Sequence, residues 1–178
     1  MQLLRLPDLR YPRVMRGRED SCGPRVAWLA LRHFGLRTSA ARLMRACRWQ
    51  PEIGAHAVGL AVGLTELGLR VEFQSDPDPS PDSAEVESYA RAAALGIPVR
   101  TPAPLDELAA LTSAERIAIL LFDHEGTGHF SILRGIDRRI AVLNDSFFVA
   151  ESLERMRAAP EVYRQTLVVS RPAAGSPS

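Results

Sequence analysis

The sequence predicts a single α+β domain in which N-terminal helices pack on a C-terminal antiparallel sheet. Its 178 residues are enough for one compact core but too few for two domains of ordinary size. Apolar residues recur at helical spacing in the first half, whereas the last third contains short β-prone runs. Helices followed by strands are typical of α+β proteins. We expect the domain to span residues 1–170 and a disordered tail to span 171–178.

The helices follow an irregular N-terminus. Asp20 and Ser21 are good N-cap residues for the first helix, and Gly35 is a typical residue at its end. A second helix follows Thr38 or Ser39. The first helix is predicted over about 22–34, and the remaining helices over about 55–67, 84–95 and 105–111.

The strands are concentrated in the last third of the chain. They are predicted over about 70–74, 116–123, 129–136, 140–145 and 163–170, with a further helix around 151–158. The Pro/Asp/Ser-rich segment 75–83 favours a loop. It opens an enlarged section, 75–111, that forms either a lid or extra core, and the apolar face of its helix favours packing.

Composition and charge exclude several classes of protein. With 22 basic and 21 acidic residues the formal net charge is +1, so we expect neither a nucleic-acid nor a membrane partner. No apolar run is long enough for a transmembrane helix, and the N-terminus lacks the pattern of a secretory signal. Two cysteines make no disulfide framework, and their spacing from the histidines fits no zinc site. We therefore expect a cytoplasmic protein without metal or organic cofactor.

Cys22 is the candidate nucleophile. It lies in the first turn of a predicted helix, where unpaired backbone N–H groups and the helix dipole favour a thiolate. Gly23 would let a substrate backbone approach. The alternative is a small buried hydrophobic residue, which is how we interpret Cys47 on the second helix.

A nucleophilic cysteine needs a base, and the chain offers four histidines. His33 lies too far along the helix of Cys22, about 16 Å away at the helical rise. His56 has no acidic neighbour in sequence, and His124 is interpreted as a solvated loop residue. His129 opens a strand, where its side chain is both anchored and accessible, so it is the candidate base.

Asp145 is the candidate residue for orienting the base. The strands that contain His129 and Asp145 are expected to form a hairpin that turns around 137–139, with Gly135 opposite about Ile140. Counting outward places Asp145 within one step of the position opposite His129. Cross-strand neighbours lie about 5 Å apart, so the carboxylate can hydrogen-bond the imidazole. Cysteine, histidine and aspartate in this order are the papain-like arrangement.

The stretches that carry these residues resemble a known family. "DSCGPRVAWLALRHFG" looks like the nucleophile motif of the bacteriocin-processing, or double-glycine leader, cysteine peptidases and their stand-alone relatives, the peptidase family-39-like proteins. "GHFSILRGID" and "IAVLND" resemble that family's histidine and aspartate strands, and "IGAHAVGLAVGLTELGLRV" resembles one of its helices. The resemblance covers about 17–146. It implies a papain-like fold with Cys22 as nucleophile, His129 as general base and acid, and Asp145 as the orienting residue.

The chain departs from that family's pattern just before the cysteine. The family usually has aspartate immediately before the cysteine, where this chain has Ser21 with Asp20 one place earlier. Its oxyanion-hole glutamine, six residues before the cysteine, is replaced here by Arg16. Arginine can donate hydrogen bonds but differs in length and charge. Gln50 or Gln74 could take over the role.

We therefore predict a cysteine peptidase that cuts a peptide or small-protein substrate. Two other functions remain open. One is a catalytically impaired member that binds a peptide in the same cleft, and the other is an acyl transferase that uses the same three residues. Arg16 favours the first of these alternatives, because loss of an oxyanion donor typically lowers turnover by about 100- to 1000-fold.

Overall fold

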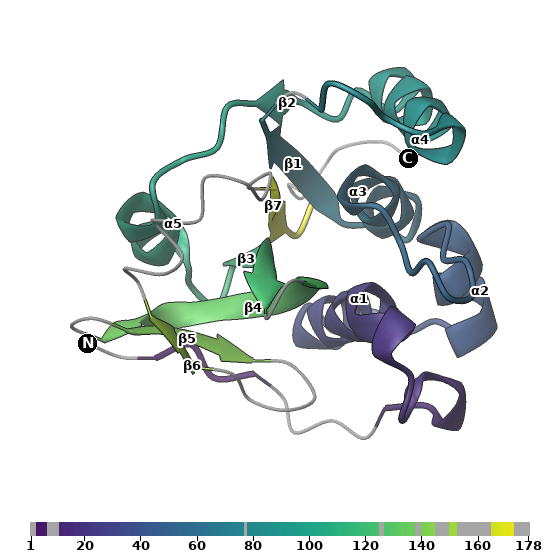
Figure 1. Ribbon diagram of the computed structural model, residues 1–178. Coiled ribbons are helices and arrows are strands. Elements are labelled where there is room, and N and C mark those ends of the chain that lie inside the picture. The colour runs from purple at the N-terminus through teal and green to yellow at the C-terminus, as the bar shows by residue number, and fades with distance from the viewer. Residues whose placement is uncertain are drawn as a thin grey trace.

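The structure, a computed structural model, describes residues 3–6, 11–76, 78–124, 127–137, 140–144, 150–152 and 165–172. Figure 1 shows the N-terminal helices gathered on one side of a twisted sheet. The predicted α+β class is therefore confirmed for the part of the chain that is described.

The helices lie where the apolar spacing predicted them. They are α1 (Cys22–His33), α2 (Ala40–Ala46), α3 (Ala57–Glu66), α4 (Ser83–Ala94) and α5 (Leu105–Leu111), and the 3-10 helices η1 (Arg13–Met15) and η2 (Glu19–Ser21) precede α1. Capping side chains mark the N-terminal ends of α2 and α4. The Ser39 hydroxyl accepts a hydrogen bond from the Arg42 N–H at 3.2 Å, and the Asp82 carboxylate accepts one from the Glu85 N–H at 2.9 Å.

The predicted side-chain cap of α1 is wrong. Ser21 occupies the N-cap position, but its hydroxyl accepts no capping hydrogen bond from the backbone N–H groups of the first turn of the helix. Instead Oγ lies 3.0 Å from the carbonyl oxygen of Met15 and 2.8 Å from that of Arg18. The hydroxyl therefore fastens the preceding turns to the start of α1.

The described residues form one seven-stranded sheet. Its spatial order is β2 (Val99–Arg100), β1 (Arg70–Ser75), β7 (Gln165–Ser170), β3 (Arg116–His124), β4 (Thr127–Asp137), β5 (Ile140–Asn144) and β6 (Ala150–Ser152). Neighbouring strands are antiparallel except for β1 and β2, which are parallel. The sheet is therefore mixed, where the sequence predicted an antiparallel one.

Two edge strands differ from the prediction. Strand β2 was not expected, because both of its residues are exposed and two residues carry no alternating pattern. Strand β6 replaces the start of the helix predicted over 151–158: Glu151 pairs with Ala141 and Ser152 with Ile140. Pairing with a neighbouring strand here overrides local helix propensity. The remainder of that predicted helix, 153–158, lies outside the described residues.

The sheet is buried on both faces. Buried side chains of α1 and α3, such as Val26 and Leu60, share a core with Ile119, Ile132 and Leu167 of the central strands. On the other face α5 packs through Leu105 and Leu108 against a second cluster: Ala118, Leu120, Phe122 and Leu133. In the enlarged section 75–111, helix α4 packs on α3 and helix α5 on β3 and β4, so these helices add core.

Candidate active site

Cys22 is the first residue of α1. It directly follows the turn η2 and is half-buried. The first N–H groups of a helix have no partner within the helix, and the positive end of its dipole lies there. The structure thus places Cys22 where the sequence predicted it, at a point that favours an anion.

His129 lies near the start of β4, directly opposite Phe122 of β3. The two rings meet edge to face, with centroids 5.6 Å apart and planes at 81°. His129 is half-buried. The aromatic contact restricts the imidazole plane at the end of the strand.

Cys22 and His129 lie within hydrogen-bond contact of each other. Burial opposes ionisation of the thiol. The hydrogen bond with His129, the backbone N–H of Phe130, the charge of His129 and the backbone N–H of Gly23 outweigh it, so the pKa of Cys22 is lowered. A lowered pKa increases the fraction of thiolate, which is the nucleophilic form of cysteine, and an adjacent imidazole is the usual activating base.

Gly23 sets how closely α1 approaches β4. A Cβ added there would lie 3.3 Å from the Phe130 ring and 3.5 Å from the Ala55 Cβ. The space above Gly23 is therefore filled by the protein's own side chains. This differs from the prediction that Gly23 leaves room for a substrate backbone. This close packing brings the Phe130 N–H to the thiol of Cys22.

A buried arginine braces the start of α1 from within. Arg25 is only 5% exposed, and its Nε donates to the Ser21 hydroxyl at 2.9 Å. Its Nη2 donates to the Arg18 carbonyl. Arg25, Ser21 and the carbonyls of Met15 and Arg18 therefore form one network beneath the turn that carries Cys22.

Asp20 ties a second segment, residues 49–54, to the same turn. Its carboxylate accepts two hydrogen bonds from Arg18, at 3.1 and 3.0 Å, and one from the Glu52 N–H at 2.9 Å. Its carbonyl accepts from the Trp49 indole at 2.9 Å, and the Arg18 guanidinium lies 4.9 Å from the Trp49 ring centroid. Gly54 has φ +92°, and a Cβ there would lie 3.2 Å from the Asp20 carbonyl oxygen. We call these contacts the Asp20 clamp.

The Asp20 clamp was missed by sequence reasoning. Asp20 was interpreted as a helix cap, and its partners Trp49 and Glu52 are some thirty residues away in the chain. No local pattern joins them. Only the packing of the segment 49–54 against the start of α1 brings them together.

Arg16 lies at the end of η1 with an exposed side chain. Its Nε donates to the Tyr11 carbonyl oxygen at 2.7 Å. The predicted role of Arg16 at the oxyanion remains a prediction. The Gln74 amide is engaged away from Cys22, by Glu72 and the Ala103 N–H, whereas Gln50 pairs through its backbone with Gly54 in the Asp20 clamp.

Asp145 lies outside the described residues, and its predicted role remains a prediction. The hairpin that was used to select it differs from expectation. Gly135 pairs with Val142 rather than Ile140, because the pairing continues to Asp137 and Ile140; farther from the turn, the register shifts between Leu133 and Gly135. The described pairing of β4 with β5 ends at Ile132 and Asn144.

Two of the other histidines, His33 and His56, have partners elsewhere in the fold. The His33 Nε2 lies 2.8 Å from the Ala114 carbonyl oxygen, far from Cys22, as its position along α1 required. His56 lies 3.0 Å from Asp82, the N-cap residue of helix α4, and 4.0 Å from Glu85 in its first turn. That pairing had no sequence signal, since it depends on how α4 packs on α3. The side chain of His124 is not among those described.

Cys47 is the second thiol, and it is fully buried at the C-terminal end of α2. Burial, with a smaller contribution from the charge of Glu66, raises its pKa to about 12. It is the packing residue that the sequence predicted. Among the described residues, no group of three or more His, Cys, Asp or Glu side chains could hold a metal ion. None of the described helices has the length and apolarity needed to cross a membrane.

Comparison with solved structures shows that the fold of this chain is a known one. One solved structure with a similar fold is the peptidase domain of Streptococcus ComA, a bifunctional ABC transporter involved in a quorum sensing pathway. It is 15% identical, with a TM-score of 0.57 over 94% of this chain and 97% of that one. Another is a double-glycine-motif protease from an AMS/PCAT transporter in complex with the leader peptide. It is 14% identical, with a TM-score of 0.59 over 96% of this chain and 95% of that one.

This protein has the fold of a double-glycine peptidase domain. The resemblance seen in the sequence is thus confirmed at the level of the α+β, papain-like fold. No family model matches the sequence, and no curated protein matches it. In the double-glycine peptidase fold of this chain, the start of α1 meets the start of β4 at Cys22 and His129.

Proposed function

We propose that this protein is a cysteine peptidase that cleaves a peptide or small-protein substrate. The contact between Cys22 and His129, which lowers the pKa of the thiol, carries the proposal. A packing cysteine is inert because burial keeps it protonated, as at Cys47. An ionised thiol next to an imidazole is what nucleophilic catalysis by cysteine requires.

The proposed reaction has two stages. The Cys22 thiolate attacks the scissile carbonyl, and the His129 imidazolium gives its proton to the leaving amine, which leaves an acyl-enzyme. His129 then takes a proton from water as the water hydrolyses the thioester. The backbone N–H of Cys22 is the proposed oxyanion donor, and Asp145 is the proposed orienting residue for the ring.

A peptide substrate fits the relatives of this fold. One of the structural neighbours was solved with a leader peptide. We extend this to the present chain as a proposal: it binds an extended peptide and cuts after a small residue, in the cytoplasm. The reaction needs no metal and no organic cofactor.

One observation supports a second candidate, a catalytically impaired module that binds a peptide. The Arg16 Nε donates to the Tyr11 carbonyl, so this arginine is partly committed elsewhere. The variant Arg16→Gln separates the two candidates. A gain in turnover approaching 100-fold would mean that the native oxyanion hole is impaired, whereas a change of less than tenfold would mean that it works without a glutamine. Acyl transfer is recognised by its products, which carry an added amine or thiol instead of a free carboxylate.

The test of the proposal is a cleavage assay on a peptide library. Purified protein is incubated with peptides from a digested proteome, and new termini are identified by mass spectrometry, with Cys22→Ala as the matched control. We expect new C-termini, enriched in small residues, that appear only with the native protein. Peptides retained by both proteins without cleavage would favour the binding module and contradict the peptidase.

A further inference from the structure

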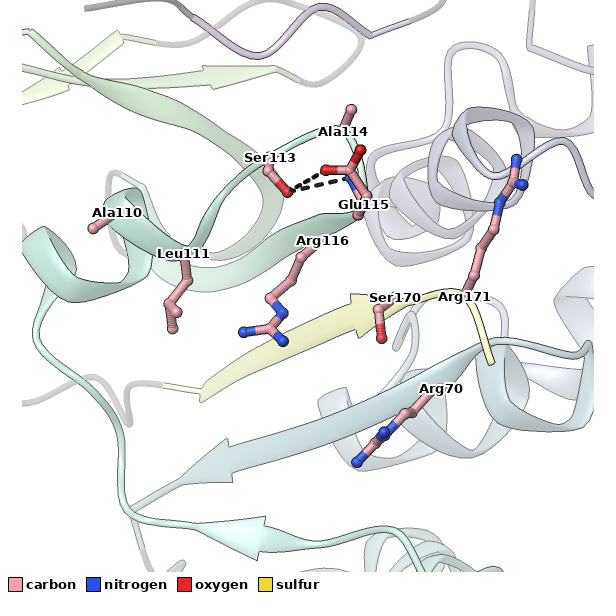
Figure 2. Close-up of a pocket in the computed structure, with 9 residues that line it drawn as sticks. All are labelled: Arg70, Ala110, Leu111, Ser113, Ala114, Glu115, Arg116, Ser170 and Arg171. Atoms are coloured by element: carbon pink, nitrogen blue, oxygen red, sulfur yellow. Dashed lines mark hydrogen bonds between the residues drawn. The ribbon is translucent and has the colours of Figure 1, made fainter. Parts of the chain in front are cut away.

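A second polar site lies away from Cys22, at the other end of the sheet. A hollow of about 770 Å³ opens between the end of α5 and the adjoining ends of β1, β7 and β3 (Figure 2). Arg116, on its rim, is six residues along β3 from Phe122, the residue opposite His129. That separation is about 20 Å along the strand, so the hollow is separate from the candidate active site.

Three side chains line this hollow in one row. Ser170 of β7 pairs with Arg70 of β1 on one side and with Arg116 of β3 on the other. Paired residues point to the same face of a sheet, and two strand spacings put the two arginine Cα atoms about 10 Å apart. Figure 2 shows Arg70, Arg116 and Ser170 pointing to one side of the sheet. Two long side chains at this spacing can reach one ligand above the Ser170 hydroxyl.

The third arginine of the hollow has a different environment. Arg171 follows Ser170 in the chain, so alternation turns it to the opposite face, toward α1 (Figure 2). Its Nη2 lies 3.6 Å from where a Cβ of Gly35 would be, just past the C-terminal end of α1. A cation at that end complements the helix dipole. Arg171 is therefore not part of the row.

Neither arginine of the row, Arg70 or Arg116, forms an ion pair with a carboxylate of the described residues. Glu115 lines the hollow, but its carboxylate accepts a hydrogen bond from the Ser113 hydroxyl at 3.0 Å. Glu72, on the same face of β1, is paired with Arg100 at 3.0 Å. The two guanidinium groups are thus available to an external anion.

We propose that Arg70, Arg116 and Ser170 form a binding site for a phosphate group, either free or carried by a small organic molecule. Guanidinium groups donate paired hydrogen bonds to phosphate oxygens, and the serine hydroxyl supplies a third donor from below. A tetrahedral phosphate offers enough acceptors for all three. The wall formed by Ala110 and Leu111 gives the organic part of a phosphate ester an apolar surface.

Isothermal titration calorimetry on the full chain tests this site, with AMP and inorganic phosphate as probes at constant ionic strength. The variants are Arg70→Gln and Arg116→Gln, and the control is Arg42→Gln, an exposed arginine of α2 that loses the same charge. We expect saturable binding that weakens about tenfold in each of the first two variants and stays unchanged in the control. Tighter binding of AMP identifies a phosphate ester as the ligand, and equal binding identifies free phosphate; both outcomes support the site.

Three results would overturn the proposal. They are absence of saturable binding at millimolar concentrations, equal binding by all three variants, and tighter binding of a triglutamate peptide than of either phosphate probe. Each arginine is exposed, so the variants are expected to fold, and thermal unfolding of each one checks this. The result is independent of the proposed peptidase, because neither arginine contacts Cys22 or His129.

Discussion

The two cysteines of this protein show how position decides the chemistry of one residue type. Cys22 begins α1, and Cys47 follows the last residue of α2. Burial raises the pKa of Cys47 to about 12, whereas the pKa of Cys22 is lowered although its thiol is also partly withdrawn from water. Exposure alone therefore does not explain the difference.

The difference comes from hydrogen-bond donors. Around Cys22 the imidazole of His129 and the backbone N–H groups of Phe130 and Gly23 face the sulfur. Around Cys47 the end of α2 offers carbonyl groups, and the charge of Glu66 adds to the penalty for a thiolate. The fold thus holds one thiol with a lowered pKa and one with a raised pKa, and the second is an internal control for every test of the site.

Removing His129 should have the largest effect on the difference between the two cysteines, because it acts on Cys22 alone. We expect His129→Ala to lower cleavage of any substrate found by the library assay at least about 1000-fold, because the thiol loses both its activating partner and its proton donor. His33→Ala, which removes a histidine bound to the Ala114 carbonyl, is the control and should keep its activity. A His129→Ala variant that retains a tenth of the native rate would contradict the assignment.

Two glycine variants perturb the two cysteines separately. A Cβ on Gly63 would lie 2.7 Å from backbone atoms of Ala46 and Cys47. Gly63→Ala should therefore lower the free energy of unfolding by about 2 kcal/mol and expose Cys47 to alkylation. In Gly23→Ala the closest contact is 3.3 Å, with the Phe130 ring, so stability should fall by less than about 1 kcal/mol. Urea unfolding with thiol mapping measures both, and the opposite order of stabilities would refute this account of the packing.

Breaking the Asp20 clamp should have a smaller effect on stability, and this effect should be confined to the turn that precedes Cys22. Asp20→Ala leaves the Glu52 N–H and Arg18 without their acceptor, and we expect a loss of about 1 to 2 kcal/mol in the free energy of unfolding. The hydrogen bond from Arg18 lowers the pKa of Asp20. The stabilisation is therefore complete above the unfolded pKa, about 3.9, and is lost as the pH falls through the lower folded value. The difference between native protein and variant should thus be constant from pH 5 to 7 and shrink below about pH 3. A difference that grows in acid would be inconsistent with the clamp.

Sequence reasoning succeeded where the determining signals are local. The apolar spacing and the polar or glycine ends of α1 to α5 are written within each segment, and so is the position of Cys22 at a helix start. The same holds for β3 and β4, which placed His129 at the mouth of a strand. The contact between these two residues then followed from chemistry, because a nucleophilic cysteine requires a base.

It failed where tertiary contacts decide. Strand β6 forms because β5 offers a pairing edge, although its residues looked helical. The hairpin register was off by two residues at Gly135, because the pairing of β4 with β5 continues to Asp137 and Ile140, closer to the turn than the count assumed. The partners of Asp20 and His56 come from segments about thirty residues away, and no periodicity records such contacts.

The most direct test of the central claim is the pH dependence of alkylation of the two thiols in the native protein. The folded chain is exposed briefly to iodoacetamide between about pH 5 and 8, and the adducts are located by peptide mass spectrometry, with His129→Ala alongside. An ordinary thiol has a pKa of about 8.5 and hardly reacts at pH 5.5. We expect Cys22 to be alkylated at pH 5.5, Cys47 to stay unmodified throughout, and His129→Ala to move the reactivity of Cys22 to higher pH. A Cys22 that reacts only near the pH of an ordinary thiol, or equally well without His129, would contradict the claim.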